Sequence, residues 1–105
     1  MRYTFKNRFE AEIDFENKRI SGVYRGGENL ICGNVPFFSV KMRKKDGSHR
    51  IISAFECGYL GENRNSRIYE NADFTIRLSV IPTESGLRWR IVVDNHTDDL
   101  LEWVE

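Results

Sequence analysis

Hydrophobic and polar residues alternate along much of this chain, and a period of two residues is typical of β-strands that bury one face. The segments 9–15, 73–81 and 87–93 show the alternation most clearly. The apolar positions that we expect to face a core in these segments are Phe9, Ala11, Ile13, Phe15, Phe74, Ile76, Leu78, Val80, Leu87, Trp89, Ile91 and Val93.

The segments 37–43 and 49–57 form the strongest hairpin candidate, because the polar stretch 44–48 between them holds the turn pair Asp46-Gly47. On the outgoing strand the apolar residues that share one face are Phe38, Val40 and Met42. The returning strand has apolar residues on both faces, and we assign the bulkier face to the core. This predicted inner face consists of Ile51, Phe55 and Cys57.

Two stretches depart from regular alternation. Gly22 interrupts the apolar pattern of residues 19–24, as a β-bulge would. The stretch 58–67 is rich in Gly, Asn and Arg, and it is predicted as a loop. Since no window of about 11 residues carries a helical period, the chain is predicted to be all-β. We expect a single domain over residues 1–105, folded as an antiparallel β-sandwich of roughly seven to nine short strands.

The charge balance limits the partners that this chain could bind. Its 105 residues include 16 Lys and Arg and 16 Asp and Glu, so the formal net charge is zero. Because a nucleic-acid backbone is bound by a basic excess on one face, nucleic acid is not expected as the main partner. The basic run 41–45 lies beside the predicted turn and is interpreted as the solvated tip of a hairpin.

Targeting signals and cysteines give little positive information. The sequence has no apolar run of about 18 residues, so no membrane span is expected. It also lacks a hydrophobic signal core near the N-terminus, which favours a cytoplasmic location unless a leader has been removed. Cys32 and Cys57 fit no metal-binding spacing and are expected to be free, buried thiols. A disulfide between them would require an oxidising compartment.

Candidate catalytic groups are sparse. His49 and His96 lie in or beside predicted turns, and the local sequence gives neither of them a Ser or Cys partner for a dyad. Glu10, Glu12 and Asp14 share one strand face at a spacing of roughly 7 Å, which paired-carboxylate chemistry could use. Their alternation with apolar residues instead indicates a solvated acidic stripe. We therefore predict no catalytic residue in this chain.

Metal and phosphate sites are not predicted either. The oxygen-rich stretch 94–98 lacks the spacing of a calcium loop, and Asx-turn chemistry explains it better. The pair Gly26-Gly27 has no helical pattern after it and no third glycine, so it is not a phosphate-binding loop. No cofactor is expected.

Three aromatic residues, Trp89, Trp103 and Tyr59, are candidates for sugar contact, because aromatic rings pack against the apolar faces of pyranoses. Trp89 is in phase with Leu87, which indicates a place in the core. Trp103 has the same parity as Leu101, so it too is expected to be buried, in an interface. Sugar stacking by these rings is therefore a hypothesis that competes with an ordinary packing role.

Several segments, taken in order, resemble a known domain family. Residues 9–32, FEAEIDFENKRISGVYRGGENLIC, contain the phrase GENLI at 27–31, and residues 35–47 run from Val-Pro-Phe-Phe to Asp-Gly. Residues 87–98 fit the pattern L-x-W-x-I-x-V-x-N-x-T-D and are followed by LEWVE at 101–105. These motifs resemble the galactose-mutarotase-like β-supersandwich that precedes the catalytic barrel in several groups of large glycoside hydrolases and related carbohydrate enzymes.

The resemblance implies a non-catalytic role. In such enzymes the acid and the nucleophile belong to the barrel, so no catalytic residue carries over to this chain. The chain would be the first part of a larger supersandwich that packs on the catalytic domain of the same parent protein and shapes one wall of a carbohydrate cleft. Two alternatives stay open: a free-standing carbohydrate-binding or protein-interaction module, and a small mutarotase-like enzyme that uses His49 or His96 with a carboxylate.

The end of the chain adds one expectation about self-association. Four of the five residues in the segment 100–104 are apolar. A sandwich without its remaining strands would leave a sheet edge unpaired, and open edges seek other strands. We therefore expect the isolated chain to form a homo-oligomer through an open sheet edge or an apolar face near Leu100–Val104.

Overall fold

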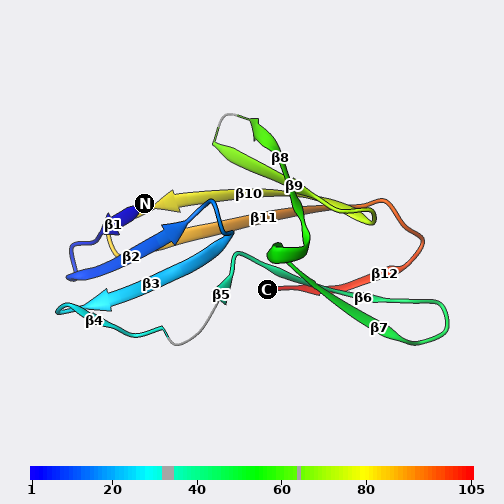
Figure 1. Cartoon of the computed structure of the whole chain (residues 1–105), viewed down its shortest axis with the longest axis horizontal. Coiled ribbons are helices and arrows are strands. Elements are labelled where there is room, and N and C mark those ends of the chain that lie inside the picture. Colours follow the sequence, from blue (N-terminus) through cyan, green and yellow to red (C-terminus); the bar gives the residue numbers. More distant parts are fainter. Residues whose placement is uncertain (32–34, 64) are drawn as a thin grey trace.

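The computed structural model describes residues 1–31, 35–63 and 65–105, and most of these residues lie in antiparallel strands (Figure 1). Twelve strands are assigned within this part of the chain, and nine of them have five or more residues. The all-β prediction is therefore confirmed. The helical content of the described residues is one short 3-10 helix, η1 (Ala54–Glu56), and no helix among them is long and apolar enough to cross a membrane.

The first five strands form the N-terminal sheet. They are β1 (Arg2–Thr4), β2 (Phe9–Asp14), β3 (Arg19–Arg25), β4 (Glu28–Asn29) and β5 (Val35–Pro36). Their order is β1-β2-β3-β4, and β5 also pairs with β3. The register between β2 and β3 skips Ser21, so the bulge predicted beside Gly22 is confirmed.

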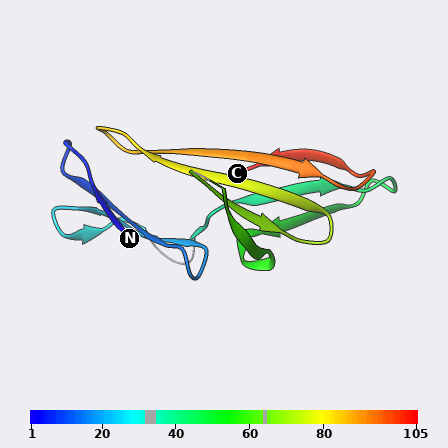
Figure 2. The same cartoon turned by 90° about the horizontal axis from the view of Figure 1, so that it is seen from above.

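The rest of the chain forms two further sheets. These contain β6 (Ser39–Arg43), β7 (His49–Ser53), β8 (Gly58–Asn63), β9 (Ser66–Glu70), β10 (Phe74–Pro82), β11 (Leu87–Asn95) and β12 (Leu100–Val104). The three-stranded sheet has the order β12-β6-β7, and the four-stranded sheet has the order β11-β10-β9-β8. Figure 2 shows the three-stranded sheet beside one half of the long β10–β11 hairpin and the N-terminal sheet beside the other half.

The hydrophobic core lies mainly between the three-stranded and four-stranded sheets. The largest fully buried side chains are Tyr69, Phe38, Phe74, Ile13, Met42, Ile76, Leu78 and Val40. The positions predicted to face inward on β11 pack against this core while keeping part of their surface accessible. The alternation in the sequence therefore correctly predicted the inner faces of β2, β10 and β11.

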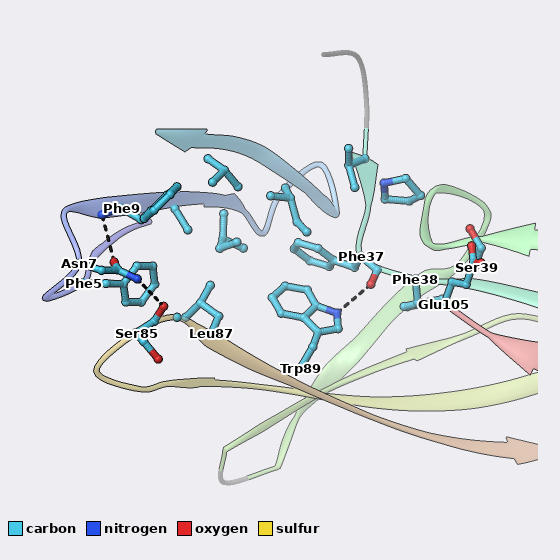
Figure 3. A pocket seen from close by; sticks show the side chains of 17 residues that line it. Phe5, Asn7, Phe9, Phe37, Phe38, Ser39, Ser85, Leu87, Trp89 and Glu105 are labelled. Carbon is cyan, nitrogen blue, oxygen red and sulfur yellow. Dashed lines mark hydrogen bonds between the residues drawn. The ribbon is translucent and has the colours of Figure 1, made fainter. Parts of the chain in front are cut away.

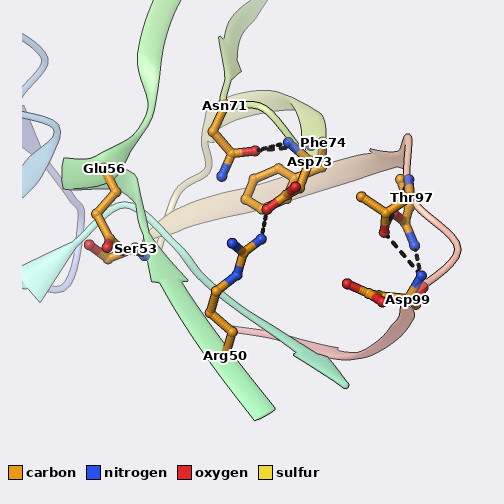
Figure 4. Close-up of polar contacts among 9 residues, drawn as sticks. Arg50, Ser53, Glu56, Asn71, Asp73, Phe74, Thr97 and Asp99 are labelled. Carbon is orange, nitrogen blue, oxygen red and sulfur yellow. Dashed lines mark hydrogen bonds and ion pairs between the residues drawn. The ribbon is translucent and has the colours of Figure 1, made fainter. Parts of the chain in front are cut away.

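The β6–β7 hairpin turns where the sequence predicted. Gly47 has a φ of 87°, in the left-handed region that favours glycine. The carboxylate of Asp46 accepts hydrogen bonds from the backbone N–H and the hydroxyl of Ser48, at 2.8 and 2.6 Å. Close to this turn, the guanidinium of Arg50 forms an ion pair with Asp73, which ties β7 to the start of β10 (Figure 4).

The predicted inner face of the returning strand is wrong. Ile52 is buried, whereas Ile51 and Phe55 are 57% and 44% exposed. The cause is η1, in which the Glu56 carboxylate accepts a hydrogen bond from the backbone N–H of Ser53 at 2.7 Å. Because this turn breaks the two-residue period, Ile52 and Cys57 both reach the core although they differ in parity.

The loop predicted for residues 58–67 is also wrong. β8 and β9 pair antiparallel across it, with a register shift between Tyr59 and Gly61. Tyr69 on β9 is 1% exposed, so core packing holds this ladder in place. Glycine and asparagine are depleted in strands, but tertiary packing overrides that weak preference here.

Candidate functional site

An apolar cleft lies between the N-terminal sheet and the β10–β11 hairpin (Figure 3). Its volume is about 730 Å³, which is within the range of ligand and docking pockets in proteins. Side chains from β2, β3 and β11 form its walls together with phenylalanines from the connecting segments. The wall residues include Phe5, Ile13, Val23, Phe37, Leu87 and Trp89.

Hydrogen bonds connect the two sides of the cleft at two places. At the hairpin tip, the side-chain amide of Asn7 donates to the backbone carbonyl of Ser85 at 3.2 Å. Deeper in the molecule, Nε1 of Trp89 donates to the carbonyl of Phe37 at 2.8 Å, and the two rings meet edge to face at 5.6 Å. Of the described residues that line the cleft, Glu105 alone is ionisable. The cleft can therefore bind apolar surface, but it holds no acid–base pair.

Trp89, the first sugar-contact candidate, forms part of this wall and packs against the core, as its parity predicted. Its indole N–H is already used by the bond to Phe37. An edge-on, hydrogen-bonded indole in a cleft wall is a packing element. The structure places Trp89 in the wall of the cleft, where its ring contacts that of Phe37. Sugar contact by Trp89 stays a prediction.

Trp103, the second candidate, lies on the outer face of the three-stranded sheet. The register between β12 and β6 shifts at Glu102, which is an extra residue in the ladder. Leu101 therefore packs against the core, whereas Trp103 lies opposite Lys41, whose ammonium is 5.9 Å from the centre of the indole ring. Trp103 and Leu101 have the same parity, but the bulge places them on opposite faces of the sheet. Burial of Trp103 in an interface stays a prediction.

Glu102 gathers three basic side chains on the same outer face. Its carboxylate is 2.5 Å from Arg43, 3.4 Å from His49 and 3.5 Å from Lys41. Only 15% of the Glu102 side chain is exposed. Burial raises the pKa of Glu102, but the charges of Arg43, His49 and Lys41 together outweigh it and hold the pKa below its usual value. The cluster ties β12 to the β6–β7 hairpin.

Tyr59, the third candidate, is 50% exposed, but its ring belongs to a packed cluster. The ring centre is 5.7 Å from that of Tyr69 and 4.9 Å from the guanidinium of Arg67. The same guanidinium is 4.4 Å from the ring of Phe15 and forms an ion pair with Glu62 at 3.0 Å. Sequence reasoning missed Arg67 because it lay in the predicted loop.

The two histidines make separate surface contacts. His49 lies beside Glu102, and Nε of Arg43 donates a hydrogen bond to its Nε2 at 3.3 Å. His96 shares a hydrogen bond of 2.7 Å with the hydroxyl of Thr75. Neither histidine lines the apolar cleft. The cleft therefore lacks the pair of a His and a carboxylate that a mutarotase-like reaction would need.

The acidic stripe on β2 is engaged in ion pairs. Glu12 and Glu10 lie 3.0 and 3.6 Å from the guanidinium of Arg2, and Asp14 lies 3.2 Å from that of Arg19. These pairs keep the three carboxylates on the outer face of the N-terminal sheet, where the alternation predicted them. Their role is electrostatic pairing at the surface.

The turn between β11 and β12 is built by a side-chain amide. The oxygen of Asn95 accepts hydrogen bonds from the N–H and the hydroxyl of Thr97, at 2.9 and 2.8 Å, and its nitrogen donates to the carbonyl of Asp99 at 2.8 Å (Figure 4). This is the Asx-turn chemistry that the sequence indicated. Within residues 1–31, 35–63 and 65–105, no three His, Cys, Asp or Glu side chains come together as metal ligands.

Cys57 is a free, buried thiol, as predicted. Burial raises its pKa to about 11, against a smaller opposing effect from the charge of Lys18. A thiol with this pKa is a poor nucleophile near neutral pH. The companion prediction for Cys32 lies outside the described residues.

No protein family, curated protein or solved structure was found to match this chain.

Proposed function

We propose that this chain is a non-catalytic β-sheet domain that acts by packing against another folded surface, with the apolar cleft as its packing surface. The observation that carries this proposal is the cleft itself. It offers about 730 Å³ of space between apolar walls, and a single ionisable residue stands at its rim. Covering such a surface with apolar groups lowers the free energy, because apolar area is removed from water.

The size and shape of the chain support the same conclusion. Its accessible surface is 6916 Å², whereas a compact monomer of this length exposes about 6,100 Å². The excess of about 800 Å² is close to what one partner contributes to an interface of standard size. The radius of gyration is 15.2 Å, against about 13 Å for a compact domain of this length. The N-terminal sheet thus extends the molecule without closing the cleft.

The sequence motifs supply a biological context for this packing role. In that context the covering surface is the catalytic domain of a carbohydrate-active parent protein, and the chain shapes one wall of its cleft. This part of the proposal rests on the supersandwich resemblance alone. The alternative of a free-standing binding module is favoured by a different observation, the outward position of Trp103 beside Lys41.

Binding of the apolar dye 1-anilinonaphthalene-8-sulfonate tests the cleft. The chain should bind about one dye molecule, because one open apolar cleft adjoins the core. Leu87→Gln places an amide in the cleft wall and should weaken dye binding about fivefold. Leu60→Gln is the matched control, because Leu60 is 57% exposed and lies outside the cleft. Absence of dye binding, or equal losses in both variants, would overturn the proposal.

The complete gene product tests the packing itself. There the partner surface should cover the cleft, so dye binding should fall to background. Leu87→Gln in the complete gene product should leave dye binding at background as well. Undiminished dye binding in the complete gene product would contradict the packing role. The enzymatic alternative is checked separately by polarimetry of freshly dissolved galactose. Mutarotation that the chain accelerates, and that His49→Asn or His96→Asn abolishes, would replace the proposal with the mutarotase-like reading.

A further inference from the structure

A row of three side chains crosses the outer face of the three-stranded sheet. Trp103 on β12 lies opposite Lys41 on β6, and Lys41 lies opposite Ile51 on β7. Directly opposed residues of antiparallel strands share one face, so these side chains are neighbours. Ile51 is 57% exposed, and Trp103 is half-buried with part of its indole accessible. The row therefore presents an aromatic and an aliphatic surface on either side of an ammonium group.

The bulge at Glu102 is what gives this face its chemistry. Glu102 is the extra residue between Leu101, which lies opposite Met42, and Trp103, which lies opposite Lys41. It adds a carboxylate beside the strand residues that face outward. Bulges re-aim side chains and recur near functional sites. Here the inserted Glu102 lies within 3.5 Å of Lys41, which is beside the indole, and of Arg43, which lies opposite Leu100 at the edge of this face.

Cations outnumber anions on this face. Lys41 and Arg43 are positively charged and Glu102 is negatively charged, which gives a formal charge of +1 with His49 neutral. Arg50 does not add to this charge, because it lies opposite Met42 and pairs with Asp73. Glu102 offsets part of the positive charge, yet Arg43 keeps half of its side chain exposed. The face is therefore suited to an anionic ligand with an apolar side.

We propose that this face binds an acidic sugar unit, a hexuronate within an oligosaccharide. The pyranose ring lies against Trp103, because the C–H groups on one side of a pyranose form an apolar surface that packs on an indole. The carboxylate of the sugar pairs with Lys41, whose ammonium is 5.9 Å from the centre of the indole ring, so one sugar unit spans both groups. Arg43 supplies a second cationic donor at the edge of the site.

The same observations disfavour a nucleic acid as the ligand. A single indole gives one stacking position, whereas strand binding uses successive aromatic rings along a basic groove. The net charge of the whole chain is zero, so the long-range field that concentrates polyanions is weak. A hexuronate needs only one ring contact and one or two cations, which this face provides.

Glu102 is a positioning residue in this site. It does not contact the sugar, because its carboxylate is 15% exposed and already surrounded by Arg43, His49 and Lys41. It holds Lys41 near the indole and Arg43 at the edge of the site. The site shares no residue with the apolar cleft, so this proposal and the packing role stand or fall independently.

Affinity electrophoresis and calorimetry of the 105-residue chain test the site. The probes are oligogalacturonate and polygalacturonate as acidic glycans, neutral galactan, and a single-stranded oligothymidylate. The chain should be retarded by polygalacturonate and should bind oligogalacturonate at least tenfold more tightly than galactan. Trp103→Ala should weaken oligogalacturonate binding about tenfold, and Lys41→Gln should weaken it several-fold while leaving galactan binding unchanged.

Two variants make the test specific. Lys6→Gln removes the same charge at a side chain that is 76% exposed, pairs with Glu84 and lies far from the site, and it should bind like the unaltered chain. Trp103→Tyr keeps an aromatic face and should retain most of the affinity, which separates lost stacking from lost folding. The proposal is overturned by no binding of oligogalacturonate at millimolar concentration, by unchanged binding in Trp103→Ala, or by oligothymidylate or galactan binding as tightly as oligogalacturonate.

Discussion

Glu102 stabilises the C-terminal strand through charge and does so from a partly buried position. Its carboxylate meets Arg43 at 2.5 Å, and 15% of its side chain is exposed. Fully exposed ion pairs contribute little, because water and salt screen them. Partial burial raises the pKa of Glu102, and the nearby charges of Arg43, His49 and Lys41 lower it further than burial raises it. The folded chain therefore favours the ionised form.

Glu102→Gln should lower stability near neutral pH, and its effect should shrink as the pH falls below 4.5. The folded-state pKa of Glu102 lies below its ordinary value of 4.5. The stabilisation is therefore fully present above the unfolded-state pKa, and it is lost as the pH falls through the folded-state pKa. Urea midpoints of the unaltered chain and the variant, measured across this pH range, should converge in acid.

Glu84→Gln is the matched control, since Glu84 is 79% exposed and pairs with Lys6 at 3.0 Å. It should change the urea midpoint little at any pH. A constant gap between the unaltered chain and Glu102→Gln across the whole pH range would show that Glu102 acts through packing instead of charge.

At the scale of the strand, alternation predicts a buried face only where nothing changes its phase. It identified the inner positions of β10, where Phe74, Ile76 and Leu78 are buried, because that strand pairs without interruption along its length. It failed after β7, where η1 resets the period, and in β12, where Glu102 is inserted. The bulge in β12 is defined by its pairing with β6, which is distant in sequence, so local reasoning does not contain it. The 3-10 helix η1 does have a local signal, a Ser at position 53 followed by a Glu at position 56, and the alternation pattern did not take it into account.

Deletion variants test the assignment of an extra residue in β3. Removing Ser21 leaves the registers on both sides unchanged, so the melting temperature should fall by less than about 5 °C, through the lost hydrogen bonds to Glu12. Removing Arg77, an exposed residue in the middle of β10, shifts half of that strand by one residue and turns its buried side chains outward. That variant should lose more than about 15 °C or fail to fold. Equal effects in thermal unfolding would contradict the bulge.

At the scale of the whole molecule, the sequence identified the aromatic candidates for ligand contact but did not predict which of them lie together. Trp89 lies in the cleft wall, Trp103 on the outer face of the three-stranded sheet, and Tyr59 beside Arg67. Which rings share a site depends on how the N-terminal sheet is placed against the β10–β11 hairpin. That placement arises from a few contacts across the cleft, such as the one between Trp89 and Phe37, and no local pattern encodes it.

The open cleft also predicts that the molecule has regions of unequal stability. β10 is central in the four-stranded sheet and supplies the core, whereas β2 faces the cleft. In hydrogen exchange, amides of β2 should therefore exchange faster than those of β10, because opening the N-terminal sheet exposes less apolar surface than complete unfolding.

Trp89→Phe isolates the contact that connects these two regions. It removes the hydrogen bond to Phe37 while keeping an aromatic ring, a loss of about 1 kcal/mol. Exchange in β2 and β3 should become about fivefold faster, while β10 changes by less than about twofold. Ile51→Val, on the opposite face of the three-stranded sheet, should leave both rates unchanged. Equal protection of β2 and β10 in the unaltered chain would mean that the three sheets unfold as one cooperative unit, and the cleft would then not be the weakest contact in the fold.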